Sequence, residues 1–279
     1  MKKISRRSFL AAAGLSVAAL ALTACGGSSA STASSVASSA ASSEAASTSA
    51  AAGELATVEA GKLTMATNAA FPPYEMTTDA GEFEGIDIET AQAIADKLGL
   101  ELQIDDMDFD AALLSVQQGK ADIVMAGVTV TDERKAVMDF SDSYATGIQS
   151  IIVPKGSDIA SPDDLAGKKI GTQRGTTGYI YCSDDFGDDN VVAYDDGLTA
   201  VQALNNGQVD AVVIDNAPAK EFVAANPGLV ILDTSYAEED YAIGMAKGSS
   251  LEDAVNATLE ELKADGTLQA IVDKYITAE

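Results

Sequence analysis

Arg134 is the side chain in this sequence whose type and position best suit binding chemistry. It follows an apolar run, residues 123–130, that is short and uncharged, which is typical of a strand buried on both faces of a parallel α/β sheet. Ligands of open α/β sheets bind at the carboxyl ends of the strands, and a guanidinium there can hold a carboxylate through two parallel hydrogen bonds. The hydroxyl of Thr129 lies in the same segment. The alternative is a surface arginine in an exposed helical turn.

The composition removes several classes of function. The 279 residues include 17 basic and 43 acidic side chains and no histidine, which gives a net charge of −26 at pH 7. A surface this acidic repels nucleic-acid phosphates, so nucleic-acid binding is not expected. Without histidine the chain cannot build a Ser-His-Asp triad or a histidine-containing metal site. Only carboxylates, lysine, tyrosine and cysteine remain for catalysis. We expect no catalytic residues, no metal and no cofactor.

The first 60 residues are expected to export and tether the protein. Residues 1–24 combine a basic start, an apolar middle and small residues before Cys25, which is the layout of a signal peptide. Leu22–Cys25 resembles the lipobox of bacterial lipoproteins, which implies cleavage before Cys25 and lipidation of its sulfur. The rest of residues 25–60 is mostly Ser, Ala, Thr and Gly, so it predicts a disordered tether. The predicted location is extracytoplasmic, with the chain held to the outer face of the bacterial cell membrane by lipid alone.

The export route stays open at this point. Ser5–Leu10 resembles a twin-arginine signal but lacks the lysine that often follows, and a basic start alone would also serve the general secretory route.

From Lys62 onward, predicted strands and helices alternate. This βαβ order predicts sheets that are parallel in their centre. Helices are expected at residues 88–98, closed by Gly99, at 111–118, and over 251–275 with a break at Gly266. Strands are expected at residues 63–67, 100–104, 123–130, 148–153, 169–172, 210–214, 229–232 and 241–246.

An internal repeat indicates two similar α/β lobes. Residues 110–124 are matched 88 positions later by residues 198–212, and in each copy a helix ends at a glycine before a strand that begins at aspartate. The second strand runs out at Asp215. If the lobes face each other, Arg134 and Thr129 confront Asp215 across a cleft, which suits a zwitterion. Asp215 could equally be the N-cap of the next helix.

The segment Gln173–Gly178 is expected to open a helix. Glycine and threonine at a helix start leave backbone N–H groups and hydroxyls free for an anion. The spacing of nucleotide-binding loops is missing and no lysine follows, so a phosphate loop is the poorer match.

Several motifs in this order resemble the family-3 solute-binding proteins of ABC importers for polar amino acids, relatives of the glutamine- and lysine/arginine/ornithine-binding proteins. The motifs are FPPYE, GIDIE, FDAALLSVQQGKADIVMAGVTVTDERKAVMDFSDSY, DLAGKKIGTQRGTTG and VDAVVIDN. The resemblance covers residues 62–276. It implies a periplasmic-binding-protein-like (type II) bilobal flytrap of two α/β lobes, residues 61–146 with 241–279 and residues 147–240, joined by two hinge strands. The hinges are expected at residues 146–149 and 238–241, where the chain crosses between the two lobes.

The same resemblance implies roles for individual residues in binding a free L-amino acid for delivery to the permease of an ABC transporter. Arg134 matches the arginine that grips the ligand α-carboxylate, and Asp215 matches the acid that receives the α-amino group. The remaining ligand-binding positions are Thr129, Thr176 and Thr177 at the carboxylate, Gly127 at the amine through its carbonyl, Phe71 and Phe109 around the ligand, and Asn68 and Gln173 at its side chain.

This sequence differs from the family at two positions that affect which ligand is bound. Ala126 stands where relatives can carry serine, and Asn68 stands where glutamine and basic-ligand binders often carry aspartate. The two amides, Asn68 and Gln173, favour a neutral polar amino acid, with basic and then acidic ligands after it. Glu75 and Asp108 are taken as solvated.

The expected protein is a monomer and not an enzyme. The alternatives are the same fold used as a cyclohexadienyl or arogenate dehydratase-like enzyme, or as the ligand-sensing domain of a receptor.

Overall fold

The computed structural model describes residues 55–276. The predicted signal peptide, Cys25 and the tether up to residue 54 lie outside the described residues. Leu55 packs against the hydrophobic core, and the N–H of Val58 donates a hydrogen bond of 2.7 Å to Asp122. The end of the segment expected to be a tether is therefore attached to the folded part.

The first sheet has five strands in the order β5-β1-β6-β14-β7. Strand β1 is parallel to β5 and β6, while β14 is antiparallel to β6 and β7, so the predicted parallel pairing holds for β5-β1-β6 and the central strand β6 has one antiparallel neighbour. Its strands are β1 (Lys62–Thr67), β5 (Glu101–Asp106), β6 (Ile123–Val124), β7 (Met138–Phe140) and β14 (Gly244–Ala246). The helices of this half are α1 (Ile86–Leu98), α2 (Phe109–Gln117), α3 (Asp132–Val137), α7 (Glu252–Ala264) and α8 (Thr267–Tyr275). A small antiparallel sheet follows β1, with strands β2 (Ala70–Phe71), β3 (Glu75–Thr77) and β4 (Phe83–Glu84).

The second sheet has the order β10-β9-β11-β8-β12, with β13 also paired to β8. Here β9 is parallel to β10 and β11, and β8 is antiparallel to its neighbours. Its strands are β8 (Ala145–Pro154), β9 (Ile170–Gln173), β10 (Val191–Tyr194), β11 (Ala211–Asp215), β12 (Leu229–Ile231) and β13 (Ala237–Tyr241). The helices are α4 (Thr177–Phe186), α5 (Gly197–Asn205) and α6 (Asn216–Ala225), with short 3-10 turns η1 (Pro162–Leu165) and η2 (Asp188–Asn190).

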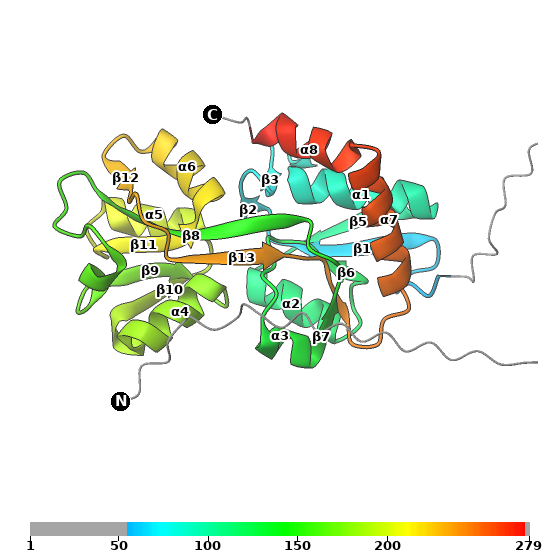
Figure 1. Ribbon diagram of the computed structural model, residues 1–279, viewed down its shortest axis with the longest axis horizontal. Helices are drawn as coiled ribbons and strands as arrows, with labels where there is room; N and C mark the ends of the chain where they lie inside the picture. The colour runs from blue at the N-terminus through cyan, green and yellow to red at the C-terminus, as the bar shows by residue number, and fades with distance from the viewer. Residues whose placement is uncertain (1–54, 277–279) are drawn as a thin grey trace, which may run out of the picture. The chain divides into compact units, whose positions relative to one another are not determined.

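Two strands of the second sheet, β8 and β13, extend towards the first sheet (Figure 1). β8 and β13 pair antiparallel, from Ala237 opposite Gln149 to Tyr241 opposite Ala145 (Figure 1). At the end of β13, Tyr241 forms an isolated bridge with Thr129, which links the crossing pair to the first sheet. The two segments expected to be hinges are therefore hydrogen-bonded to each other.

The internal repeat is visible in the helix ends. Gly119 and Gly207 both have φ of +67°, a left-handed conformation that glycine adopts without steric cost. The next residue in each copy donates its N–H back into the helix, Lys120 to Ser115 and Gln208 to Ala203, both at 2.9 Å. The break between α7 and α8 likewise falls at the predicted Gly266, whose φ is +82°.

The strand expected over residues 123–130 is much shorter than predicted. β6 ends at Val124, because the chain turns at Gly127, whose φ is +54° and whose N–H donates to Asp87 Oδ2 at 3.0 Å instead of to a neighbouring strand. The N–H of Val130 then donates to the carbonyl of Asp240 at 3.0 Å. This path carries the segment from the first sheet to β13. The strand expected over residues 241–246 is also divided, into the end of β13 and β14.

Apolar side chains fill the space between the sheets and their helices. Leu63, Met65 and Ile123 are fully buried in the first half, and Ile151 and Ile170 in the second. Within residues 55–276, no helix is long and apolar enough to cross a bilayer.

Candidate functional site

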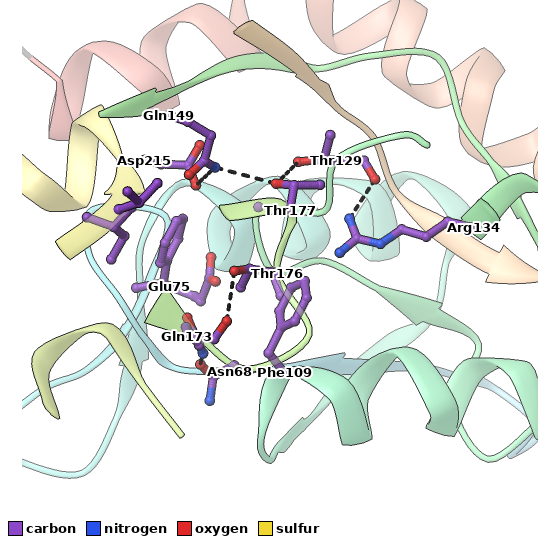
Figure 2. A pocket seen from close by; sticks show the side chains of 15 residues that line it. Asn68, Glu75, Phe109, Thr129, Arg134, Gln149, Gln173, Thr176, Thr177 and Asp215 are labelled. Carbon is purple, nitrogen blue, oxygen red and sulfur yellow. Dashed lines mark hydrogen bonds between the residues drawn. The ribbon is translucent and has the colours of Figure 1, made fainter. Parts of the chain in front are cut away.

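A pocket lies where segments of both halves meet, and about 420 Å³ of space, open solvent included, lies between its walls (Figure 2). All ten residues predicted to bind ligand line it: Asn68, Phe71, Phe109, Gly127, Thr129, Arg134, Gln173, Thr176, Thr177 and Asp215. Five further residues complete the lining: Glu75, Ala126, Gln149, Val213 and Ile214. The predicted lipidation residue, Cys25, lies outside the described residues.

Arg134 is held in place by the backbone on both sides of the pocket. It lies on α3, whose N-cap Thr131 accepts the Arg134 N–H at 3.2 Å. The guanidinium donates through Nη1 to the carbonyl of Thr129 at 2.7 Å and through Nη2 to the carbonyl of Gly175 at 3.1 Å. The side chain is buried, and burial lowers the pKa of Arg134. Because a guanidinium has five N–H groups, three donors remain for an anion.

The start of α4 supplies further donors to the same region. Thr176 is the N-cap, with its hydroxyl accepting the Tyr179 N–H at 3.3 Å and donating to the Gln173 carbonyl at 2.9 Å. The Thr176 hydroxyl is thus committed to the helix end. The first N–H groups of a helix have no acceptor within the helix, so those of Thr177 and Gly178 suit an anion.

Asp215 ends β11 and occupies the N-cap position of α6, but its side chain makes no capping hydrogen bond. Its Oδ2 accepts the Gln149 Nε2–H at 2.8 Å, and its Oδ1 accepts no hydrogen bond from the described residues. Burial raises the pKa of Asp215 to about 7; the Tyr241 hydroxyl and the Gln149 amide oppose the rise and the charge of Glu239 adds to it. A buried carboxylate with an open oxygen suits an ammonium group.

The two predicted aromatic residues serve both the core and the pocket. Phe71 stacks on Tyr74 with ring centroids 6.1 Å apart, and Phe109 lies under the Arg134 guanidinium at 5.4 Å. Phe71 also packs beside Gly127, where an added Cβ would lie 2.9 Å from its ring. A side chain at position 127 would therefore displace Phe71 from the pocket wall.

The two amides expected to set selectivity are bonded to each other. Gln173 Nε2 donates to Asn68 Oδ1 at 2.8 Å and to the carbonyl of Asp195 at 3.2 Å, so both its hydrogens are used. Asn68 Nδ2 donates to the carbonyl of Met107 at 2.9 Å. What Gln173 leaves for a ligand is its carbonyl oxygen, an acceptor. The neighbouring Arg174 is half exposed and pairs with Asp195 at 3.6 Å.

Glu75 was predicted to be solvated, and that prediction is wrong. Its side chain is 0% exposed, it lines the pocket, and neither carboxyl oxygen accepts a hydrogen bond from the described residues. Burial and the nearby charge of Asp87 hold the pKa of Glu75 well above its usual range. Asp87 itself accepts hydrogen bonds from Tyr144 at 2.7 Å and Gly127 at 3.0 Å, and burial raises its pKa to about 6.

Two more polar residues, Gln149 in the pocket lining and Glu239 behind it, were not predicted from the sequence. Gln149 donates to Asp215 from the middle of β8, and Glu239 on β13 accepts hydrogen bonds from Thr129 and Thr177. A signal for Gln149 was present, since Gln149 and Ser150 interrupt an apolar strand. Glu239 lies in a run of acids, Glu238–Asp240, that the sequence alone does not separate.

The charges of the site are arranged for a zwitterion. Arg134 and Asp215 line one pocket and lie on opposite sides of it in Figure 2. Donors gather around Arg134 and the start of α4, and open acceptors gather around Asp215. No group of three or more His, Cys, Asp or Glu side chains within residues 55–276 is placed to hold a metal ion.

Comparison with known proteins finds amino-acid-binding proteins among those most similar to this chain. The L-cystine-binding protein TcyJ of Escherichia coli (strain K12) is 34% identical over 226 residues, which cover 79% of this chain and 85% of that protein. A solved structure of an ancestral arginine-binding protein bound to arginine is 43% identical with a TM-score of 0.74, and the match covers 77% of this chain and 98% of that one. A structure of an ancestral arginine-binding protein bound to glutamine is 42% identical with a TM-score of 0.75 and covers 78% and 99%.

These neighbours and the two mixed sheets show the predicted fold, a periplasmic-binding-protein-like (type II) bilobal flytrap. The family described as bacterial extracellular solute-binding proteins, family 3, matches residues 63–278. The chain therefore belongs to family 3 of the bacterial extracellular solute-binding proteins.

Proposed function

We propose that this protein binds one free L-amino acid in the pocket and delivers it to the permease of an ABC importer. Arg134 binds the α-carboxylate, with Thr129 and the first N–H groups of α4 at Thr177 beside it. Asp215 receives the α-ammonium, helped by the carbonyl of Gly127. The observation that carries the proposal is the burial of Arg134 and Asp215 in one pocket, each with unused hydrogen-bonding capacity.

The family supports binding rather than turnover. Its members are solute-binding proteins and not enzymes, so the dehydratase-like alternative is set aside. The curated relatives include cystine-, arginine- and glutamine-binding proteins, several of them described as parts of ABC transporters. A receptor domain would bind the same ligand, and co-purification with a permease separates the two roles.

The side-chain end of the pocket presents acceptors. Gln173 uses both amide hydrogens within the protein, and Glu75 contributes a buried carboxyl group that accepts no hydrogen bond from the described residues. The ligand side chain must therefore bring hydrogen-bond donors, and an acidic side chain fits poorly. Phe71 and Phe109 offer ring faces to a planar group between them.

We propose arginine as the first ligand candidate and glutamine as the second. The guanidinium is planar, rich in N–H groups and positively charged, so its binding would lower the raised pKa of Glu75 and pair the cation with the resulting carboxylate. Glutamine keeps the neutral polar ligand that the sequence favoured, since its amide also supplies two N–H groups. The arginine- and glutamine-bound ancestral proteins support both candidates.

A ligand panel tests this assignment. We expect arginine to raise the melting temperature most in a thermal-shift screen, glutamine next, and glutamate not at all. Glu75→Gln separates the two candidates, because it should weaken arginine binding by about tenfold or more while leaving glutamine binding little changed. An equal effect on both ligands would remove Glu75 from ligand selection.

We also propose the location and the division into lobes. Residues 1–24 are cleaved, Cys25 is lipidated, and residues 61–146 with 241–279 form one lobe while residues 147–240 form the other. The two sheets and the β8–β13 pair support the lobe boundaries. Cys25→Ala should release the protein from cells into the medium, and mass spectrometry of the membrane-bound form should find a lipid on Cys25.

A further inference from the structure

Glu239 is a buried carboxylate that the proposed binding pose does not use. It lies on β13 opposite Gly147 of β8 and is 7% exposed. Its Oε2 accepts three hydrogen bonds, from Thr177 Oγ1 at 2.9 Å, Thr129 Oγ1 at 3.0 Å and Gln149 Nε2 at 3.1 Å. Hydrogen bonds to an ionised acceptor are about twice as strong as neutral ones. Glu239 therefore holds the side chains of Thr129, Gln149 and Thr177 close to one another.

The three donors come from different parts of the fold. Thr129 lies beyond β6 of the first sheet, Thr177 is the first residue of α4 on the second sheet, and Gln149 lies on β8. With Glu239 on β13, one oxygen atom joins both crossing strands to both halves of the pocket.

Glu239 supports the pocket wall from behind. Thr129, Thr177 and Gln149 line the pocket, and Glu239 does not belong to its lining. The same Gln149 nitrogen also donates to Asp215 at 2.8 Å. The carboxylate therefore contacts the residues around the ligand space without filling that space.

Separation of the lobes would break this arrangement. The hydroxyls of Thr129 and Thr177 lie 3.5 Å apart, one from each half of the pocket. If the halves move apart, a single oxygen cannot keep both hydroxyls within hydrogen-bond distance. The buried charge would then lose donors, which is costly for a carboxylate.

We propose that Glu239 is a closure latch, a positioning residue whose carboxylate holds Thr129 and Thr177 together across the pocket and so slows release of the bound amino acid. The claim that Glu239 slows ligand release rests on the proposed function. The claim that Glu239 stabilises the closed arrangement rests on the geometry alone. The expected signature is a faster dissociation rate with little change in the association rate.

Two substitutions at Glu239 and matched substitutions at Glu238 test the latch. Glu239→Ala removes the acceptor, and Glu239→Gln keeps an acceptor oxygen but removes the charge. Glu238 is the adjacent acid on the same strand and is exposed, so Glu238→Ala and Glu238→Gln remove the same groups without touching the threonines. Circular dichroism and thermal unfolding check that all four variants fold.

Arginine dissociation is measured at pH 8, above the pKa of Asp215 of about 7, so that a change in the charge near Asp215 does not alter its ionisation. We expect Glu239→Ala to raise the dissociation rate by about tenfold or more and Glu239→Gln to raise it by less. Both Glu238 variants should match the wild type. Dissociation of Glu239→Ala within twofold of Glu238→Ala, or tighter binding, would overturn the latch.

Hydrogen exchange without added ligand tests the latch independently of the ligand assignment, because it reports on the fraction of the empty protein that already occupies the closed arrangement. We expect Glu239→Ala to speed amide exchange in residues 127–131 and 176–180 together, while Glu238→Ala changes neither segment. Unchanged exchange in both segments would overturn the latch even if the wild type binds arginine tightly. Faster exchange in a protein that binds no amino acid would instead contradict the proposed function and leave the latch supported.

Discussion

The side-chain amide of Gln173 donates a hydrogen bond of 2.8 Å to Oδ1 of Asn68, between residues 105 positions apart in the sequence. Both residues line the pocket, and the bond crosses it from the end of β9 to the loop after β1. The two side chains that the sequence offered as separate selectivity groups therefore act as one unit. Within this unit, Gln173 keeps only its carbonyl oxygen for a ligand, and Asn68 keeps one N–H group.

Asn68→Asp should shift selectivity towards cationic amino acids. A carboxylate at position 68 still accepts from Gln173 but adds a negative charge at the side-chain end of the pocket. We expect the ratio of arginine to glutamine affinity to rise by about tenfold or more, measured by calorimetry with both ligands. A lower ratio, or an unchanged one, would mean that the ligand side chain does not reach position 68.

Gly127→Ala should weaken ligand binding through displacement of Phe71, in addition to destabilising the fold through its left-handed backbone. The position has φ of +54°, and the added Cβ would lie 2.9 Å from the Phe71 ring. Gly248→Ala is the matched control, because its φ is +76° and nothing lies within 4 Å of an added Cβ. Each substitution should lower the free energy of unfolding by about 1–2 kcal/mol for the left-handed backbone alone.

Calorimetry then separates the two glycine variants. Gly127→Ala should lose about tenfold or more in affinity because Phe71 is displaced, while Gly248→Ala binds as the wild type does. Equal affinities would show that the Phe71 ring does not contact the ligand.

Ligand affinity should fall as the pH falls through 7. Burial raises the pKa of Asp215 to about 7 in the empty pocket, and a bound ammonium would lower it. With glutamine as the ligand, which does not require Glu75 to ionise, binding releases a proton below pH 7 and none well above it, so affinity is constant near pH 8 and decreases by up to about tenfold per unit at lower pH. Calorimetry between pH 5.5 and 8 in buffers of different ionisation enthalpy measures both the affinity and the released proton. A flat profile would mean that Asp215 does not meet the ammonium.

Binding should also close the two lobes about the β8–β13 pair. The chain passes between the sheets in these strands, so movement must concentrate in residues 146–149 and 238–241. Small-angle scattering should show a smaller radius of gyration at saturating arginine. Arg134→Ala at the same arginine concentration should keep the ligand-free value, and a wild-type radius that does not change would contradict closure.

Much of the fold could be predicted because its signals are local. Glycines at positions 99 and 266 end or divide helices as expected, and the repeated helix, glycine and aspartate pattern correctly places α2 with β6 and α5 with β11. The length of β6 could not be predicted, because its end depends on Asp87, a side chain 40 positions away that takes the Gly127 N–H. A local apolar pattern cannot show that a distant side chain accepts a backbone hydrogen bond in place of a neighbouring strand.

The residues of the site also fall into those that the sequence could predict and those that it could not. Arg134 and Asp215 could be found from charge, strand ends and family resemblance together. Glu75 could not, because its burial results from packing of the short β2-β3-β4 sheet against α1, and the sequence shows only a glutamate near two prolines. Glu239 could not be separated from Glu238 without knowing which face of β13 meets the pocket wall.

The most direct test of the proposed function is arginine binding by Arg134→Ala compared with Arg174→Ala. Arg134 is buried in the pocket, whereas Arg174 is half exposed and pairs with Asp195, so the two variants remove the same group from different places. We expect calorimetry to show a loss of about 30-fold or more for Arg134→Ala, because removing one partner of a buried charge pair costs about 2–5 kcal/mol, and wild-type affinity for Arg174→Ala. Affinity of Arg134→Ala within threefold of the wild type would contradict amino-acid binding by this pocket.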